Sequence, residues 1–275
     1  MSATSAITLP HGLLGGGRRR STAELRLPTG ADEAALLEAR DRSRAEQVTG
    51  LLARCVARVA ELEADEDVAR SLTVGDREAL LLHLRASLFG DRLSCVIDCP
   101  ECGEAMDVDL LVSDLLVPPY GEVHERHTVE LPGERGEADV RLVTGADQEA
   151  AARCSGGDAG LEELIKRCVL DVRGDEGTMP PLVLAEEVSD SLAELDPQAE
   201  ITVDAICPSC DESVSALVDA AAILLAELTA GDDRLLREVD AIARAYHWSE
   251  AEILALDVRR RRRYLELIVD EGEES

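Results

Sequence analysis

The feature that most constrains the fold of this chain is an internal duplication. Residues 26–32, Arg-Leu-Pro-Thr-Gly-Ala-Asp, recur as residues 141–147, Arg-Leu-Val-Thr-Gly-Ala-Asp, with six of seven positions identical. Two further matches follow in the same order and pair Cys55 with Cys168 and residues 99–102 with residues 207–210. A repeat of this kind predicts two units of similar fold, each about 110 residues long.

Each unit begins with a strand pattern and then a helix start. Residues 23–27 and 138–142 alternate small or apolar side chains with charged ones, as half-buried strands do, and each is expected to pair with the Leu-Pro segment before it. Thr29 and Thr144 stand three residues before an aspartate, an arrangement close to a capping box, which predicts a helix start. The helices expected in the two units cover residues 32–62, 77–88, 147–172 and 184–195.

The segment after the second unit predicts helices over residues 216–228, 232–246 and 258–269, followed by a frayed acidic tail at 270–275. Three of the five aromatic residues of the chain lie here, and they either close a small core or anchor a partner. The basic run 259–263 is expected to bridge acidic helices or an acidic partner. The residues predicted to contact a partner are Tyr246, Trp248, Arg262, Arg263 and Tyr264.

These patterns predict an α+β fold, mostly α-helical, with two tandem pseudo-repeats and a C-terminal helical segment. Each repeat is expected to hold a β-hairpin, helices and a metal-binding turn. The predicted boundaries are 1–22 for a flexible N-terminal strand and Gly/Arg-rich loop, 23–120 for the first repeat, 121–225 for the second, and 226–275 for the C-terminal segment with its acidic tail.

The two Cys-Pro-x-Cys sequences predict a metal site shared between the repeats. Two cysteines three positions apart on a tight turn form a zinc knuckle, which supplies two of the four thiolates of a tetrahedral zinc site. Both knuckles lie between short β-prone runs. We therefore expect one structural zinc ion per chain in a four-cysteine zinc ribbon, bound by Cys99, Cys102, Cys207 and Cys210.

The other cysteines and two of the histidines show weaker evidence of metal binding. Cys55 and Cys168 occupy equivalent positions beside apolar neighbours and are expected to be small core residues. Cys95 and Cys154 have no counterpart in the repeat and receive no role. His124 and His127 could share a metal, but their position in a charged loop before a hairpin favours an ordinary surface pair.

Charge and composition exclude several classes of function. The chain has 28 Lys and Arg against 57 Asp and Glu, and a net charge of −29 disfavours nucleic acid and membrane surfaces as partners. The sequence contains no apolar run of transmembrane length and no signal-peptide pattern, so a cytoplasmic location is expected. In that compartment eight cysteines indicate metal binding or burial rather than disulfides.

The sequence contains no catalytic motif: GxSxG, a Walker loop, GxGxxG and HExxH are all missing. A site of four thiolates also leaves a metal no open coordination position for chemistry. These features predict a protein that is not an enzyme, has no small-molecule substrate, and binds other proteins.

Several segments resemble the baseplate hub assembly chaperone family of contractile-tailed phages and phage-derived contractile injection systems. The resemblance rests on TVGDRE at 73–78, LLLHLR at 80–85, FGDR at 89–92, the first Cys-Pro-x-Cys-Gly, and the segments YHWSEAEILAL at 246–256 and RRYLELI at 262–268. It implies a non-enzymatic assembly chaperone whose partners are baseplate or tail hub proteins, and it implies no catalytic residues. Two alternatives remain: a permanent structural component of the baseplate, and a zinc-ribbon nucleic-acid-binding protein, which the charge disfavours.

Overall fold

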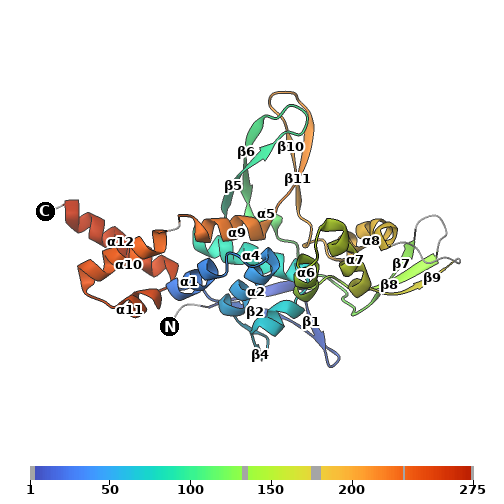
Figure 1. The fold of residues 1–275 in the computed structure, drawn as a ribbon, viewed down its shortest axis with the longest axis horizontal. Helices are drawn as coiled ribbons and strands as arrows, with labels where there is room; N and C mark the ends of the chain where they lie inside the picture. The colour runs from blue at the N-terminus through green and yellow to red at the C-terminus, as the bar shows by residue number, and fades with distance from the viewer. Residues whose placement is uncertain (1–3, 132–135, 175–180, 232, 274–275) are drawn as a thin grey trace.

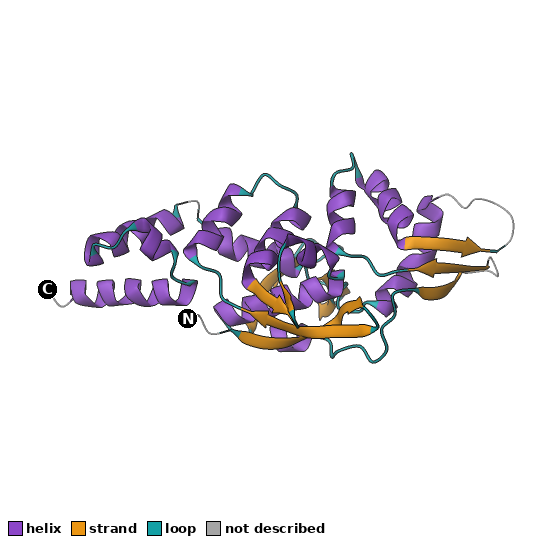
Figure 2. Cartoon of the chain, turned by 90° about the horizontal axis from the view of Figure 1, so that it is seen from below, coloured by secondary structure: helices purple, strands orange, loops and turns teal. Residues whose placement is uncertain are grey.

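The computed structural model describes residues 4–131, 136–174, 181–231 and 233–273. Within these ranges the strands form four separate antiparallel sheets, with helices packed around them (Figures 1 and 2). The strands are β1 (Ser5–Gly15), β2 (Arg18–Leu25), β3 (Val56–Val59), β4 (Leu62–Glu63), β5 (Arg92–Asp98), β6 (Ala105–Leu111), β7 (His127–Leu131), β8 (Gly136–Val140), β9 (Val169–Arg173), β10 (Thr202–Ile206) and β11 (Ser213–Leu217). The helices are α1 (Gly30–Glu38), α2 (Arg44–Cys55), α3 (Glu66–Ser71), α4 (Val74–Phe89), α5 (Val112–Leu115), α6 (Gly145–Ala152), α7 (Gly157–Cys168), α8 (Pro181–Leu195), α9 (Ala220–Thr229), α10 (Arg234–Tyr246), α11 (Glu250–Leu254) and α12 (Val258–Glu273).

The two β-rich parts of the body are built alike. One sheet has the order β1-β2-β3-β4 and the other β7-β8-β9, so each expected pairing with the preceding segment is confirmed. The expectation that helix continues through residues 56–62 and 169–172 is wrong, because β3 and β9 begin there and pair with β2 and β8. β-branched Val56 and Val169 open these strands, and a third strand satisfies backbone groups that a lone hairpin leaves unpaired.

The repeated Thr-Gly-Ala-Asp turns share the hydrogen bonds that the arginine and the threonine donate to the aspartate, and Asp147 also accepts one from Arg167 at 2.6 Å. The capping boxes predicted at Thr29 and Thr144 are both confirmed. Asp32 accepts hydrogen bonds from Arg26 at 2.7 and 3.1 Å, and the corresponding bonds to Asp147 measure 2.6 and 2.9 Å. Burial opposes ionisation of Asp147, but its arginine and threonine partners outweigh this and hold its pKa well below the usual range.

A tight corner between two helices from elsewhere in the chain packs against each of these turns. The Gly30 N–H donates to the Leu256 carbonyl in the α11–α12 corner, and the Gly145 N–H donates to the Leu72 carbonyl in the α3–α4 corner, both at 3.1 Å. A fully buried arginine lies under each turn, Arg261 under the first and Arg77 under the second. A Cβ on Gly145 would come within 2.2 Å of Nη1 of Arg77. Glycine is therefore required at position 145, where a side chain would collide with this buried guanidinium.

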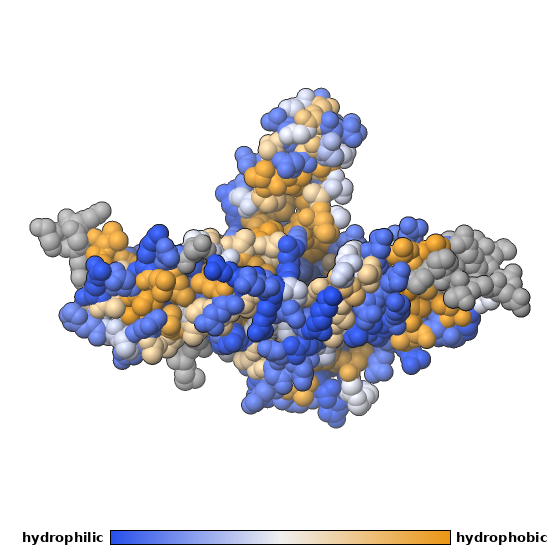
Figure 3. Space-filling view, viewed as in Figure 1, coloured by the Kyte–Doolittle hydropathy of each residue, from blue (hydrophilic) through white to orange (hydrophobic). Residues whose placement is uncertain are grey.

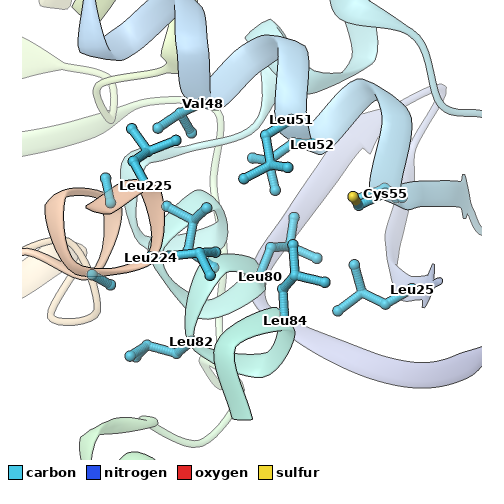
Figure 4. Packing of buried hydrophobic residues seen from close by; sticks show 14 of the residues in the cluster. Leu25, Val48, Leu51, Leu52, Cys55, Leu80, Leu82, Leu84, Leu224 and Leu225 are labelled. Carbon is cyan, nitrogen blue, oxygen red and sulfur yellow. The ribbon is translucent and has the colours of Figure 1, made fainter. Parts of the chain in front are cut away.

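The hydrophobic residues divide into two main cores. The first core joins β1, β2, α2, α4 and α9, and Figure 4 shows Leu224 and Leu225 of α9 facing Val48 of α2 and Leu80 of α4. The second core is smaller and lies between β7, β8, α7 and α8. Aliphatic side chains fill both cores, as the shortage of aromatic residues in the sequence requires.

The C-terminal segment differs from the prediction at both ends. Residues 216–217 belong to β11, because they pair with β10, so helix α9 begins only at Ala220. Helix α12 continues to Glu273, so residues 270–273 of the predicted frayed tail are helical, and 274–275 lie outside the described residues. The expected bridging role of the basic run is confirmed for Arg261, which is fully buried and pairs with Glu33 and Glu238.

Candidate metal centre

The two Cys-Pro-x-Cys sequences lie at the tip of an arm formed by the hairpins β5–β6 and β10–β11. The hairpins project side by side from the helical body (Figure 1). They meet through a small cluster of buried residues, which are Cys99, Met106, Cys207 and Val214. Figure 3 shows apolar residues along this arm among polar ones. The arm brings together two segments more than a hundred residues apart in the sequence.

The two turns have matching backbone geometry. In the first turn the Cys99 carbonyl accepts the N–H of Gly103 at 2.9 Å, and in the second the Cys207 carbonyl accepts the N–H of Asp211 at 2.9 Å. Gly103 has φ 74° and Asp211 has φ 58°, so both adopt the left-handed conformation. Aspartate tolerates this conformation better than most residues, which explains why it can replace glycine in the second turn.

The spacing of the four sulfur atoms fits a tetrahedral metal. All four Sγ atoms lie within 4.8 Å of one another, with Cys99 3.7 Å from Cys210 and Cys102 3.6 Å from Cys207. A metal–sulfur bond of about 2.3 Å in a tetrahedron places sulfur atoms about 3.8 Å apart. A disulfide requires about 2.05 Å, and the cysteines of the described residues are free thiols. The four cysteines can therefore bind a metal ion together.

The thiols of the cluster influence one another's ionisation. Burial disfavours the Cys207 thiolate, but N–H groups of Ser209 and Cys210 outweigh it and lower its pKa to about 7. The N–H of Glu212 favours the Cys210 thiolate, but desolvation and the neighbouring thiols raise its pKa to about 12. The Cys207 thiolate thus forms readily, whereas desolvation and the neighbouring thiols disfavour the Cys210 thiolate. A divalent cation would favour the charged form of each thiol and allow all four thiolates to form.

The other cysteines and the histidine pair stay outside this cluster. Cys55 and Cys168 are both buried, as predicted, and Cys55 belongs to the first core. The rings of His124 and His127 lie 5.8 Å apart at an angle of 74°. Across the ranges that the structure describes, no third metal-ligating side chain joins these histidines.

The predicted partner-contact residues lie together on the C-terminal segment. The rings of Tyr246, Trp248 and Tyr264 pack on one another with centroids 5.0 to 5.4 Å apart, and all three are half-buried. Arg262 lies over the ring of Phe89, 5.1 Å from its centroid, and Arg263 pairs with the next turn of its own helix. The three rings thus form one aromatic cluster, whereas Arg262 and Arg263 contact Phe89 and Glu266.

A buried polar junction that the sequence patterns did not predict lies between the two units. The fully buried carboxylate of Asp76 accepts the N–H groups of His11 and Gly12 at 2.8 Å each. Asp196, also buried, accepts the hydroxyl of Tyr120 at 2.7 Å. Burial raises the pKa of Asp76 to about 7 and raises that of Asp196. Nothing in the sequence marks this junction, because Asp76 has the spacing of an ordinary helix-cap residue.

Comparison with known proteins identifies the family. A family described as "T4 bacteriophage base plate protein" matches residues 8–224, a span that includes both repeated turns and all four clustered cysteines. No curated protein and no solved structure shows a significant match. No helix in the described part of the chain is long and apolar enough to cross a membrane. The match covers most of the chain, which therefore belongs to the family of T4 bacteriophage base plate proteins.

Proposed function

We propose that this protein is a non-enzymatic assembly chaperone for the baseplate hub of a contractile phage tail or phage-derived injection system. Membership of the base plate family is the observation that carries the proposal, since it associates the chain with other baseplate or tail proteins. Unassembled baseplate proteins expose interface surface that would otherwise associate prematurely. A soluble partner that covers this surface prevents premature association.

Charge and composition favour a chaperone over a permanent baseplate component. A net charge of −29 keeps a complex soluble and opposes self-association. A permanent component needs large apolar interfaces, in which aromatic side chains are enriched, and only 2% of this chain is aromatic. These properties suit a protein that binds its client and leaves.

The metal in this proposal is a structural zinc ion held by the four clustered cysteines. Zinc prefers tetrahedral thiolate ligands, and a four-thiolate site leaves no open position for a reacting water or substrate. Its role is to join the two hairpins, because each is a two-stranded sheet that is marginally stable by itself.

We assign client contact to the aromatic cluster Tyr246, Trp248 and Tyr264 and to Arg262 and Arg263. The rings are half-buried, so they retain surface for a partner, and Arg263 is exposed. Trp248→Ala should reduce capture of tail hub proteins, and Arg263→Ala, at an exposed position, should do so while thermal stability stays close to that of the parent. Removing the whole segment is a poorer test, because buried Val258 belongs to the first core.

Mass spectrometry of purified mature particles tests the chaperone assignment. The chain should be absent, or far below the stoichiometry of baseplate subunits, while deletion of its gene should stop baseplate formation. Recovery of the chain at the stoichiometry of baseplate subunits would instead identify a permanent structural component. Normal baseplates in the deletion strain would contradict both assignments.

A further inference from the structure

The two units differ in what covers their helical faces. In the first unit, α9 lies across α2 and α4 and buries Leu224, Leu225 and Leu228 in the first core (Figure 4). Helix α9 follows directly after the hairpin β10–β11, which belongs to the second repeat. The first unit is therefore completed by a helix supplied from elsewhere in the chain.

The equivalent face of the second unit is an open groove between α7 and α8. The groove has a volume of about 290 Å³ and an apolar floor formed by Leu161, Leu164, Ile165, Ala185, Val188 and Leu192. Leu161 occupies the repeat position of Val48, yet it is 38% exposed whereas Val48 is 4% exposed. In the part of the chain that the structure describes, this face keeps leucine side chains partly in solvent.

The helices that border the two faces carry the same apolar pattern. Helix α4 places core leucines at 80, 81, 84 and 88, and α8 places Leu184, Ala185, Val188 and Leu192 at the same spacing. On the other side, Leu51 and Leu52 of α2 correspond to Leu164 and Ile165 of α7 in the repeat. The groove of the second unit thus presents the kind of surface that α9 fills in the first.

Charge at the margin of the groove restricts its occupant. Glu200 lines the groove and is exposed, and Glu186 and Asp190 are exposed on α8 beside the lining residues Ala185 and Ser189. The whole chain also carries a net charge of −29. A helix with lysine or arginine beside its apolar face gains Coulomb energy here, whereas an acidic one is repelled.

We propose that the α7–α8 groove binds an amphipathic helix of a partner protein, with a leucine-rich apolar face flanked by basic residues. The helix would occupy in the second unit the place that α9 occupies in the first. Helix-in-groove binding of this kind relies on apolar anchors one turn apart. The proposal holds whether the protein leaves the particle or stays in it.

The test uses the full-length protein and a designed probe. The probe is a stapled, fluorescein-labelled helical peptide with leucines spaced as in Leu224, Leu225 and Leu228 and lysines on its flanks. A second peptide carries glutamate in place of every lysine. Fluorescence anisotropy is measured with the parent protein, with Leu161→Gln in the groove, and with Leu236→Gln as a matched control. Leu236 is 61% exposed on α10, outside the groove.

The lysine peptide should bind the parent and the Leu236→Gln protein equally, and bind Leu161→Gln about tenfold more weakly because one apolar anchor is lost. Ser189→Trp, which fills the groove, should also block binding, and the glutamate peptide should bind far more weakly. The proposal is overturned if the lysine peptide does not bind, if both leucine variants behave alike, or if the glutamate peptide binds as well. A parent dimer that Leu161→Gln dissociates would show that a second copy covers the groove.

Discussion

Cys207→Ser removes one of the four sulfur ligands at the tip of the arm, and its effect can be worked out from the geometry of the site. Structural zinc in small thiolate sites contributes about 10–16 kcal/mol at neutral pH. Shared equally among four ligands, this is about 2.5–4 kcal/mol for each sulfur. The variant should therefore bind zinc about 10²- to 10³-fold more weakly than the parent.

Loss of the metal should loosen both hairpins of the arm together. Few buried side chains besides the cysteines join the hairpins, and isolated two-stranded sheets are marginally stable. Hydrogen exchange should therefore speed up across residues 92–111 and 202–217. Helix α4 should remain protected, because its leucines lie in the first core, away from the arm.

Elemental analysis, zinc competition with a chelating dye and hydrogen-exchange mass spectrometry measure these effects. The matched control is Cys95→Ser, a cysteine on the other hairpin of the arm, β5–β6, whose thiol contacts the Val108 carbonyl at 3.7 Å and takes no part in the cluster. The parent and this control should each contain one zinc ion per chain. Zero or two zinc ions in the parent, or unchanged exchange in the arm of Cys207→Ser, would refute the shared site.

Three further predictions test the packing and electrostatics of the body. Glu33→Gln removes one of the two carboxylates that pair with buried Arg261 and leaves Glu238 as the other, so it should lower the free energy of unfolding in urea by about 1.5–3 kcal/mol. Glu266→Gln, in an exposed pair, should change it by less than about 1 kcal/mol. Gly145→Ala should lower the free energy of unfolding by about 1–3 kcal/mol, because its Cβ would lie 2.2 Å from the buried guanidinium of Arg77. Gly50→Ala, whose Cβ would have no atom within 4 Å, should instead raise the free energy of unfolding by about 0.5–1 kcal/mol. Burial raises the pKa of Glu78 to about 7, so the folded protein holds a proton that the unfolded chain has released, and stability should fall as pH rises from about 5 to about 7. Glu78→Gln should flatten that slope by up to about 1.4 kcal/mol per pH unit, and an unchanged slope would contradict the assignment.

Local sequence patterns predicted much of the secondary structure. The caps predicted at Thr29 and Thr144 are present in the structure, because a cap depends on residues only three positions apart. Residues 56–59 and 169–172, which form strands, were predicted to be helical. Each is short and directly follows a helix, so it becomes a strand only because a hairpin edge is available for pairing.

The candidate metal ligands followed from the sequence for a similar reason. Each Cys-Pro-x-Cys turn places its own two sulfurs, and the repeat indicated that the two turns are equivalent. That Cys99 lies beside Cys210 and Cys102 beside Cys207 required the folded arm. The spacing in the sequence could not show this, because a gap of about a hundred residues leaves many possible paths between the turns.

The sequence alone determined the recurring Thr-Gly-Ala-Asp segments, the helix caps and the two Cys-Pro-x-Cys turns, because each depends on residues close together in the chain. It also determined that the cores are aliphatic, because the chain has few aromatic residues. Only the tertiary structure decided which partners meet across the chain. It placed the α11–α12 corner under the first turn, buried Arg261 against Glu33, and laid α9 over the first unit while leaving the α7–α8 groove open. These contacts join residues far apart in sequence, and no local pattern specifies them.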